Sequence, residues 1–382
     1  MNDIHIPDPS WGSNLANIIL DLEKLRTKRL YGNVPPYIFF QLKEIFHILE
    51  TLGSARIEGN NTTLSEYVEN IIESNVNDES NDEIKNLENA IDFIEETTDE
   101  NTIFNRAFIS DVHKILTKGL TPPPGGEGSR NPGELRTHNV SIKSSGHTPP
   151  EHFLLPEYFE KFIDFINFPH KEQYQLLMVA IAHHRFEFIH PFDNGNGRMG
   201  RLLNYAFLIK LGFQVKNGRI VNPSSVFYTD RDKYYEMLSC ADSLENDDIL
   251  SWCEYFLRGL KNEIEKIDSL LDNDYVKKQI LLPALQIARE SKHITDQEFK
   301  ILEYLINKDD MAMKSEELSH LGINDSKKKA TIMGRLKDKS IIAPLTNGGR
   351  IYTIKFGKNY LLRGVIKVLE ENGFVSDFLN NN

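Results

Sequence analysis

The sequence predicts a mainly helical fold. Apolar residues recur at helical spacing along most of the chain, and one short segment near the C-terminus has the pattern of a β-hairpin. With 382 residues, 40% of them hydrophobic, the chain is long enough for two to three domains with substantial cores. Runs rich in proline and glycine separate the helical stretches. We expect three consecutive domains at residues 1–100, 101–270 and 275–382.

The N-terminal region is predicted to be a set of helices. Apolar residues at helical spacing place these helices at residues 15–29, 36–53, 64–74 and 82–97. The segment 54–60 closes the second run, where Gly59 is a plausible stop for a helix. The acidic stretch 75–83 is predicted to be a solvated turn between helices.

The central region is predicted to hold further helices around a loop. Residues 121–128 are rich in proline and glycine and form the predicted loop, and Pro149-Pro150 stops any helix there. The predicted helices cover residues 105–120, 155–168, 173–189, 199–211 and 230–260.

The C-terminal region changes character near residue 275. Predicted helices at 296–307, 314–321 and 326–339 precede a hairpin whose strands include Ile341-Ile342 and residues 350–355, joined through 347–349. This order resembles a winged helix. Residues 291–360 hold 13 Lys or Arg against 9 Asp or Glu. The basic residues of 326–339 favour either contact with nucleic-acid phosphates or a solvated helix that binds protein, and we leave both open.

The most informative segment is residues 190–201, HPFDNGNGRMGR. Gly195 and Gly197 lack Cβ atoms, so their N–H groups can approach an anion at the start of the following helix. Arg198 and Arg201 add positive charge at that helix end, which is favourable when an anion offsets it. His190 can accept a hydroxyl proton near neutral pH. The segment therefore predicts a polyphosphate site with a base beside it.

Two other interpretations of this segment are weaker. Residues 195–200 fit the dinucleotide pattern G-x-G-x-x-G, but they follow a helical run, and no Asp or Glu lies between residues 210 and 221 to bind a ribose. His183, His184 and His190 do not match a zinc-binding spacing. We expect His183 and His184 to be packed, hydrogen-bonded residues.

The segment resembles the signature of the Fic family, H-x-F-x-[D/E]-G-N-G-R-x-x-R. It departs at Asn194, where the family usually has the acid that binds Mg²⁺; the acid here is Asp193. The residues that match are His190, Phe192, Gly195, Asn196, Gly197, Arg198 and Arg201. The resemblance implies a Fic-type helical core and transfer of AMP from ATP to a hydroxyl side chain of a protein.

The resemblance also implies roles for individual residues. His190 is the base that deprotonates the target hydroxyl, and Phe192 is expected to be a core anchor. Asn194 takes the place of the ligand for Mg²⁺ or Mn²⁺, without charge. The phosphates of ATP are held by Gly195, Asn196, Gly197, Arg198 and Arg201.

Two segments outside the signature add to the resemblance. Residues 133–142 resemble the family's flap hairpin, which docks the target by strand addition and here includes Leu135, Thr137 and Val140. Tyr234, Tyr235 and the region of Trp252 resemble the stretch that closes the core, so both tyrosines are candidates for nucleotide binding.

A second motif lies near the N-terminus. Residues 54–60, SARIEGN, are similar to the family's inhibitory motif [S/T]-x-x-x-E-[G/N], with Ser54 and Glu58 at its defining positions. In such proteins the glutamate pairs with the second signature arginine, which implies a pair between Glu58 and Arg201. The alternative is an ordinary exposed glutamate near a helix end. Whether the same glutamate also supports removal of AMP is left open.

Composition narrows the cellular context. No run approaches the ~20 apolar residues of a membrane span, and the first residues lack the apolar region of a signal peptide, so we expect a cytoplasmic protein without membrane contact. Cys240 and Cys253 are expected to be reduced, packed thiols. The net charge of −12 argues against general coating of nucleic acid.

Two function classes remain. One is an autoinhibited protein adenylyltransferase whose target is unknown, with modification of itself and assembly into a homodimer both left open. The other is a DNA-binding regulator whose nucleotide site only senses its ligand.

Overall fold

The computed structural model describes residues 4–27, 32–73, 79–142, 147–213 and 222–380. The chain divides into two compact units that are each assembled from separate segments. The first unit comprises Met1–Arg29, Glu50–Thr62 and Asn77–Glu265, and the second comprises Leu30–Leu49, Thr63–Val76 and Lys266–Asn382. This division differs from the three consecutive domains expected from the sequence, because helix α2 (Pro36–Glu58) contributes residues to both units.

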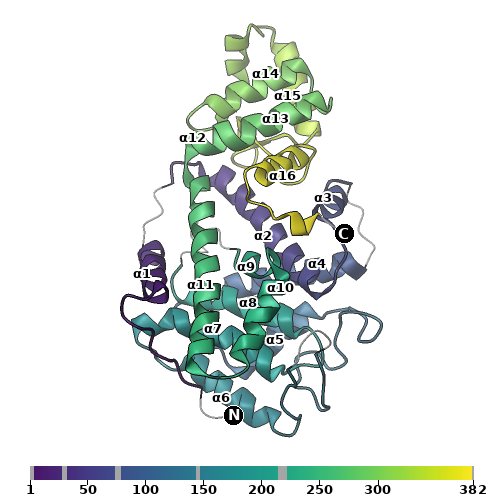
Figure 1. Cartoon of the computed structure of the whole chain (residues 1–382). Helices are drawn as coiled ribbons and strands as arrows, with labels where there is room; N and C mark the ends of the chain where they lie inside the picture. Colours follow the sequence, from purple (N-terminus) through teal and green to yellow (C-terminus); the bar gives the residue numbers. More distant parts are fainter. Residues whose placement is uncertain (1–3, 28–31, 74–78, 143–146, 214–221, 381–382) are drawn as a thin grey trace. The chain divides into compact units, whose positions relative to one another are not determined.

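Helices α7 (Glu172–Ile189) and α8 (Asn196–Lys210) form the centre of the first unit (Figure 1). Both helices are buried on nearly all sides, as expected for helices without a polar face. Around them lie α1 (Asn14–Thr27), the last part of α2 (Pro36–Glu58), α4 (Glu79–Thr97), α5 (Arg106–Leu116), α6 (Leu155–Asn167), α9 (Ser225–Tyr228), α10 (Arg231–Ala241) and α11 (Asn246–Asp268).

Aromatic side chains fill the core between these helices. Phe104 meets Phe207 edge to face at 5.1 Å between ring centroids, and Phe162 lies 5.6 Å from Phe186. Phe192 is 1% exposed and stacks on His113 at 3.8 Å. The prediction that Phe192 is a core anchor is therefore confirmed.

The second unit combines helices with a small sheet. Three antiparallel strands, β1 (Ala312–Lys314), β2 (Ile342–Pro344) and β3 (Ile351–Ile354), lie in the order β1-β3-β2, with Met313 opposite Tyr352 and Ala343 opposite Thr353. Its helical elements include the first part of α2, α3 (Leu64–Glu73), α12 (Asn273–Tyr275), a π-helical turn (Val276–Leu281), α13 (Leu282–Glu290), α14 (Asp296–Asn307), α15 (Ser326–Asp338), α16 (Leu361–Glu371) and three 3₁₀ helices (Ser269–Leu271, Ser315–Leu321 and Asp377–Leu379).

Most of the predicted helices are present, and the C-terminal hairpin is confirmed as β2 and β3. The sequence did not predict β1, α13 or α16. The fold is mainly helical with one small sheet, as predicted, while the specific likeness to a winged helix stays a prediction.

Three local expectations are wrong. The stretch 75–83 is not a solvated turn in its described part, because α4 begins at Glu79 and Glu83 is only 3% exposed. Residues 133–142 contain no strand, although the resemblance implied a hairpin there. Cys240 is exposed and not packed, whereas Cys253 is buried as expected and both thiols are free.

The irregular path of residues 133–142 has a physical cause. The backbone N–H of Arg136 donates to the carbonyl of Pro191, and its guanidinium donates to the carbonyl of His138 within the same segment. These bonds use groups that would otherwise pair across a hairpin.

No helix of the described ranges is long and apolar enough to cross a membrane.

Candidate active site

The turn before α8 has the form expected of an anion site. Gly195 has a φ of 76°, a left-handed conformation that glycine adopts without strain, and α8 begins directly after it. The side chain of Asn196 accepts from the N–H of Phe192 at 2.8 Å and donates to its carbonyl at 2.9 Å. Asn196 therefore holds the turn closed with both ends of its amide, and the first backbone N–H groups of α8 are the donors for an anion.

His190 lies at the C-terminal end of α7 in a left-handed conformation, with φ of 49°. Burial lowers the pKa of its imidazole to about 4, although the negative charge of Glu58 and the carbonyl of Glu187 act in the opposite direction. The ring is therefore neutral at pH 7, as a proton acceptor must be. Its Nδ1 atom is buried and has no hydrogen-bond partner among the described residues.

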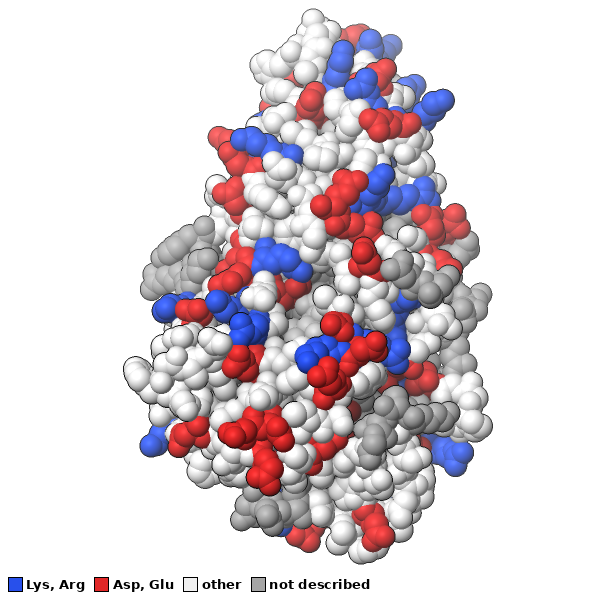
Figure 2. All heavy atoms as spheres, in the orientation of Figure 1, with Lys and Arg blue, Asp and Glu red and all other residues white. Residues whose placement is uncertain are grey.

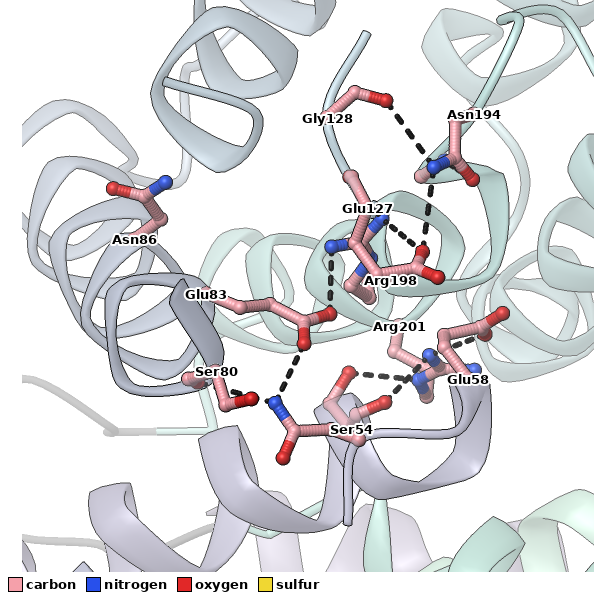
Figure 3. A network of polar contacts seen from close by, with 12 residues as sticks. Ser54, Glu58, Ser80, Glu83, Asn86, Glu127, Gly128, Asn194, Arg198 and Arg201 are labelled. Atoms are coloured by element: carbon pink, nitrogen blue, oxygen red, sulfur yellow. Dashed lines mark hydrogen bonds and ion pairs between the residues drawn. The ribbon is translucent and has the colours of Figure 1, made fainter. Parts of the chain in front are cut away.

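Arg201 is held by two residues of α2 (Figure 3). Its Nη2 atom lies 2.7 Å from Oε1 of Glu58 and donates to the carbonyl of Ser54 at 3.0 Å, while Nε donates to the Ser54 hydroxyl at 2.8 Å. Burial alone would lower the pKa of Arg201, but the charge of Glu58 outweighs it and raises the pKa. The contact between Glu58 and Arg201 that the resemblance implied is present; an inhibitory role for it stays a prediction.

Arg198 is held by two other carboxylates, which the sequence did not predict (Figure 3). Its side chain is fully buried, with Nη1 at 2.7 Å from Oε1 of Glu83. Its Nη2 atom donates to the carbonyl of Glu127 at 2.8 Å and to Oε2 of the same residue at 3.1 Å. Burial raises the pKa of Glu83, and the charge of Arg198 opposes that rise. The side chain expected to hold phosphate thus lies between protein carboxylates.

The residues at the expected metal position are Asp193 and Asn194. The Asp193 carboxylate accepts from the hydroxyl of Ser129 at 2.5 Å and from the N–H of Arg130 at 2.9 Å. Asn194 accepts from the N–H of Gly195 at 2.8 Å and donates from Nδ2 to Glu127 Oε2 at 3.3 Å. Within the described part of the chain, no group of three or more His, Cys, Asp or Glu could hold a metal ion. A metal here would need ligands from a bound nucleotide or water.

A cavity of about 170 Å³ lies in front of the turn. It brings together His190, Gly197, Arg201 and Glu58 with both predicted tyrosines, and its remaining lining residues are Ile142, His147, His184, Glu187, Phe188, Leu238, Ser239 and Asp242. A larger cavity of about 440 Å³ is lined by residues 4–6 and parts of α6 and α7, and it contains none of the signature residues.

The side chains behind this cavity are fixed by hydrogen bonds. Tyr234 is 1% exposed, and its hydroxyl lies 2.9 Å from Nε2 of His183. His184 lies 3.1 Å from Asp242. The prediction that His183 and His184 are packed, hydrogen-bonded residues is therefore confirmed. Tyr235 is partly exposed, with Arg231 5.5 Å from the centre of its ring.

Sequence reasoning also missed Glu187, on α7. Its Oε1 atom is buried without a hydrogen-bond partner among the described residues, and burial raises the pKa of its carboxyl to about 8. Oε1 would lie 2.3 Å from a Cβ atom at Gly200, so the glycine makes room for it. The sequence feature that could have indicated Glu187 is its position three residues before His190.

The residues predicted to dock a target lie at the surface of the first unit. Thr137 is exposed, and Leu135 and Val140 are half-buried. These residues have no strand partners in the described structure, so docking by strand addition stays a prediction. Ile142, two residues beyond Val140, reaches the cavity.

The basic residues of α15 divide into two groups. Lys329, Lys337 and Lys339 contact neighbouring groups of the second unit, whereas Lys327, Lys328 and Arg335 are exposed. Figure 2 shows acidic side chains next to basic ones near α14 and α15 on the face drawn. The positive charge of α15 is thus partly used inside its own unit.

Comparison with known proteins gives the family of the central segment. Residues 103–208 match the model of the Fic/DOC family. Protein adenylyltransferase Fic of Drosophila ananassae is 29% identical over 203 residues, which are 51% of this chain and 36% of that protein. The chain thus spans little more than a third of the length of this relative.

Solved structures share the fold. A Fic family protein from Desulfovibrio desulfuricans G20 superposes with a TM-score of 0.55 at 20% identity, covering 92% of this chain and 98% of that one. A Fic domain containing signaling protein from Bacteroides thetaiotaomicron has a TM-score of 0.53 at 16% identity, covering 68% and 97%. Residues 103–208 thus match the Fic/DOC family model, and about half of the chain is distantly similar to protein adenylyltransferase Fic.

Proposed function

We propose that this protein is an autoinhibited protein adenylyltransferase, which moves AMP from ATP to a hydroxyl side chain of a target protein. The observation that carries the proposal is the ion pair of Glu58 with Arg201, 2.7 Å long and located in the cavity that also contains His190. A carboxylate on this arginine occupies the place at which a phosphate of the nucleotide would bind.

The chemistry follows from the residues around the cavity. The neutral imidazole of His190 accepts the proton of the target hydroxyl, whose oxygen forms a bond to the α-phosphorus of ATP. The bond from that phosphorus to the pyrophosphate breaks, and pyrophosphate leaves with the electron pair. The N–H groups at the start of α8 and the cation of Arg201 offset the negative charge of the phosphates, which is the main requirement of such a transfer.

Autoinhibition follows from competition for Arg201. Arg201 is 1% exposed, and its Nε and Nη2 atoms are bound by Ser54 and Glu58, so a phosphate that needs Nη2 must displace the carboxylate. Charge-assisted hydrogen bonds to a buried arginine are stronger than neutral ones. They therefore favour the state in which Glu58 is paired with Arg201. The donor would be ATP with Mg²⁺ or Mn²⁺. Removal of AMP by the same site, self-modification, and a homodimer stay open proposals.

The test is transfer of label from α-labelled ATP by wild type, Glu58→Gly and Glu58→Gly with His190→Ala, each with Mg²⁺ or Mn²⁺. We expect label to rise with the first variant and to vanish with the second. Glu96→Gly, at an exposed glutamate near the end of α4, is the matched control and should behave as wild type. Absence of label in every protein, on itself and on added lysate proteins, would overturn the proposal.

A second function is supported by the C-terminal elements. The order α14, β1, 3₁₀ helix, α15, β2, β3 resembles that expected of a winged helix, and Lys327, Lys328 and Arg335 are exposed on α15. We propose that α15 contacts nucleic-acid phosphates. Binding of the full chain to duplex DNA should then weaken with salt, and Lys327→Glu with Lys328→Glu should reduce that salt dependence. Affinity that is absent, or unchanged by these substitutions, would favour a protein partner for α15.

A further inference from the structure

The loop 121–128 places a carboxylate beside the position where the signature lacks one. Glu127 Oε2 lies 3.3 Å from Nδ2 of Asn194 and 3.1 Å from Nη2 of Arg198, and the adjacent carbonyl of Gly128 also accepts from Asn194 at 3.2 Å (Figure 3). The Glu127 side chain is therefore fixed at the start of α8 by both residues. Its other oxygen, Oε1, accepts no hydrogen bond from the described residues.

The charged side chains around Asn194 and Arg198 include more carboxylates than cations. Arg198 already has a close partner in Glu83, whose side chain is 4% exposed, so the two form a buried ion pair at 2.7 Å. Glu127, with a side chain that is 40% exposed, and Asp193 add two further negative groups. A polyphosphate bound at the adjacent turn would be repelled by them unless a cation lay between.

The chemistry of the donor set fits a hard divalent cation. Mg²⁺ is usually bound through one or two carboxylates together with phosphate oxygens and water, and does not require a complete cage of protein ligands. The Asn194 oxygen accepts from the N–H of Gly195, and its Nδ2 atom is the one that faces Glu127. Glu127 therefore supplies the charged oxygen beside Asn194. This agrees with the lack of a self-sufficient metal cluster in the described residues.

We propose that Glu127, fixed beside Asn194 by Arg198, supplies the charged protein ligand of the divalent cation that accompanies ATP. The proposal rests on the proposed function, because the cation is bound together with the nucleotide. Arg198 then acts as a positioning residue for the loop, and Arg201 is the signature arginine left to meet phosphate.

The test separates metal binding from nucleotide binding and does not depend on turnover. Binding of ATP to the full-length Glu58→Gly protein is measured by calorimetry in EDTA and in Mg²⁺, and the ratio of the two affinities is the readout. Glu127→Gln is added to this background to remove the charge but retain the size. Glu160→Gln, at an exposed glutamate of α6, is the matched control.

We expect Glu127→Gln to reduce the gain in affinity from Mg²⁺ by about tenfold or more, without loss of affinity in EDTA. Glu160→Gln should leave the ratio unchanged. Adding Asn194→Asp to Glu127→Gln should restore the gain, because it returns a negative charge to the same place. Restoration by a second substitution also shows that the loop still folds.

Two outcomes would overturn the inference. If Glu127→Gln weakens ATP binding equally in EDTA and in Mg²⁺, Glu127 serves only to tie the loop to Arg198. If it changes neither affinity, the cation does not use Glu127. Failure of the Glu58→Gly protein to bind ATP in either condition would instead overturn the proposed function, and this inference with it.

Discussion

The Nε atom of Arg136 donates a hydrogen bond to the backbone carbonyl of His190 at 2.8 Å. The same guanidinium donates to the carbonyls of Pro150 at 2.6 Å and His138 at 3.0 Å, and Arg136 is 3% exposed. It thus ties the segment 133–142 to the residue expected to act as base, and it holds His190 in its left-handed conformation.

Arg136→Lys should therefore impair transfer more than nucleotide binding. One ammonium group cannot replace a planar donor that reaches several carbonyls, and each buried carbonyl left unpaired costs about 1–3 kcal/mol. In the Glu58→Gly background we expect label transfer to fall by about tenfold or more, while ATP affinity changes less than about twofold. Arg130→Lys, at an exposed arginine with one carbonyl partner, is the control. Equal losses of binding and transfer would contradict a role in placing His190.

The pH dependence of transfer tests the state of His190. Burial lowers the pKa of this imidazole to about 4, and Glu58 acts to raise it, so loss of Glu58 lowers it further. The base is then already neutral across the neutral range. We expect the rate of the Glu58→Gly protein to stay level from about pH 6 to 8, with no acidic limb in that interval. A half-maximal rate near pH 6.5, the ordinary value for histidine, would show that the ring is not desolvated in solution.

Gly197 tests how closely a ligand approaches α8. A Cβ atom there would lie 2.1 Å from Oε1 of Glu58 and 3.2 Å from Nη1 of Arg201. Gly197→Ala therefore displaces the Glu58 carboxylate, yet it also fills the space in front of the turn. We expect ATP affinity to fall about tenfold or more even in the Glu58→Gly background, where no carboxylate remains to be displaced. Gly334→Ala on α15, where a Cβ atom meets nothing within 4 Å, should leave ATP binding unchanged.

The sequence predicted those parts of the site that are local in the chain. The turn at 190–201 could be recognised because its glycines, arginines and histidine are contiguous, and the helices on either side show clear apolar periodicity. The contact of Glu58 with Arg201 spans 143 residues, and only the resemblance of two motifs predicted it.

The partners of Arg198 and His190 were missed because they depend on the tertiary fold. Glu83 lies 115 residues from Arg198, within an acidic run that is typical of a solvated turn. Burial against Arg198 reversed that expectation, since a buried cation requires a partner charge. The sequence did contain a hint: Arg198 near the start of a helix is unfavourable without an anion, and two carboxylates of the protein supply it.

Glu187 predicts how stability depends on pH. Burial raises the pKa of its carboxyl to about 8 in the folded protein, whereas an unfolded chain gives glutamate its ordinary value of 4.5. The folded state therefore holds a proton that the unfolded state has lost, and stability contributed by this group falls as pH rises toward 8. The buried carboxyl of Glu50, with a pKa of about 7, acts in the same direction.

Buried histidines change the stability in the opposite direction, over a lower pH range. Burial lowers the pKa of His183 to about 3 and that of His113 to about 4, so the unfolded state binds their protons first and stability rises with pH until the ordinary value of 6.5 is passed. Above about pH 7.5 their contribution is level. In the interval from about pH 7 to 9 the carboxyl of Glu187 therefore changes most, with a smaller contribution from Glu50.

Glu187→Gln should become more stable relative to wild type as pH rises through this interval. The amide has nearly the same shape and does not ionise, so it avoids the cost of a buried negative charge at high pH, while Glu50 and the histidines contribute equally to both proteins. We expect the difference in Tm between the variant and wild type to grow from pH 7 to pH 9, and the difference for Glu160→Gln to stay constant. A constant difference for Glu187→Gln as well would mean that the carboxyl is already ionised at pH 7, with Arg201 compensating its charge.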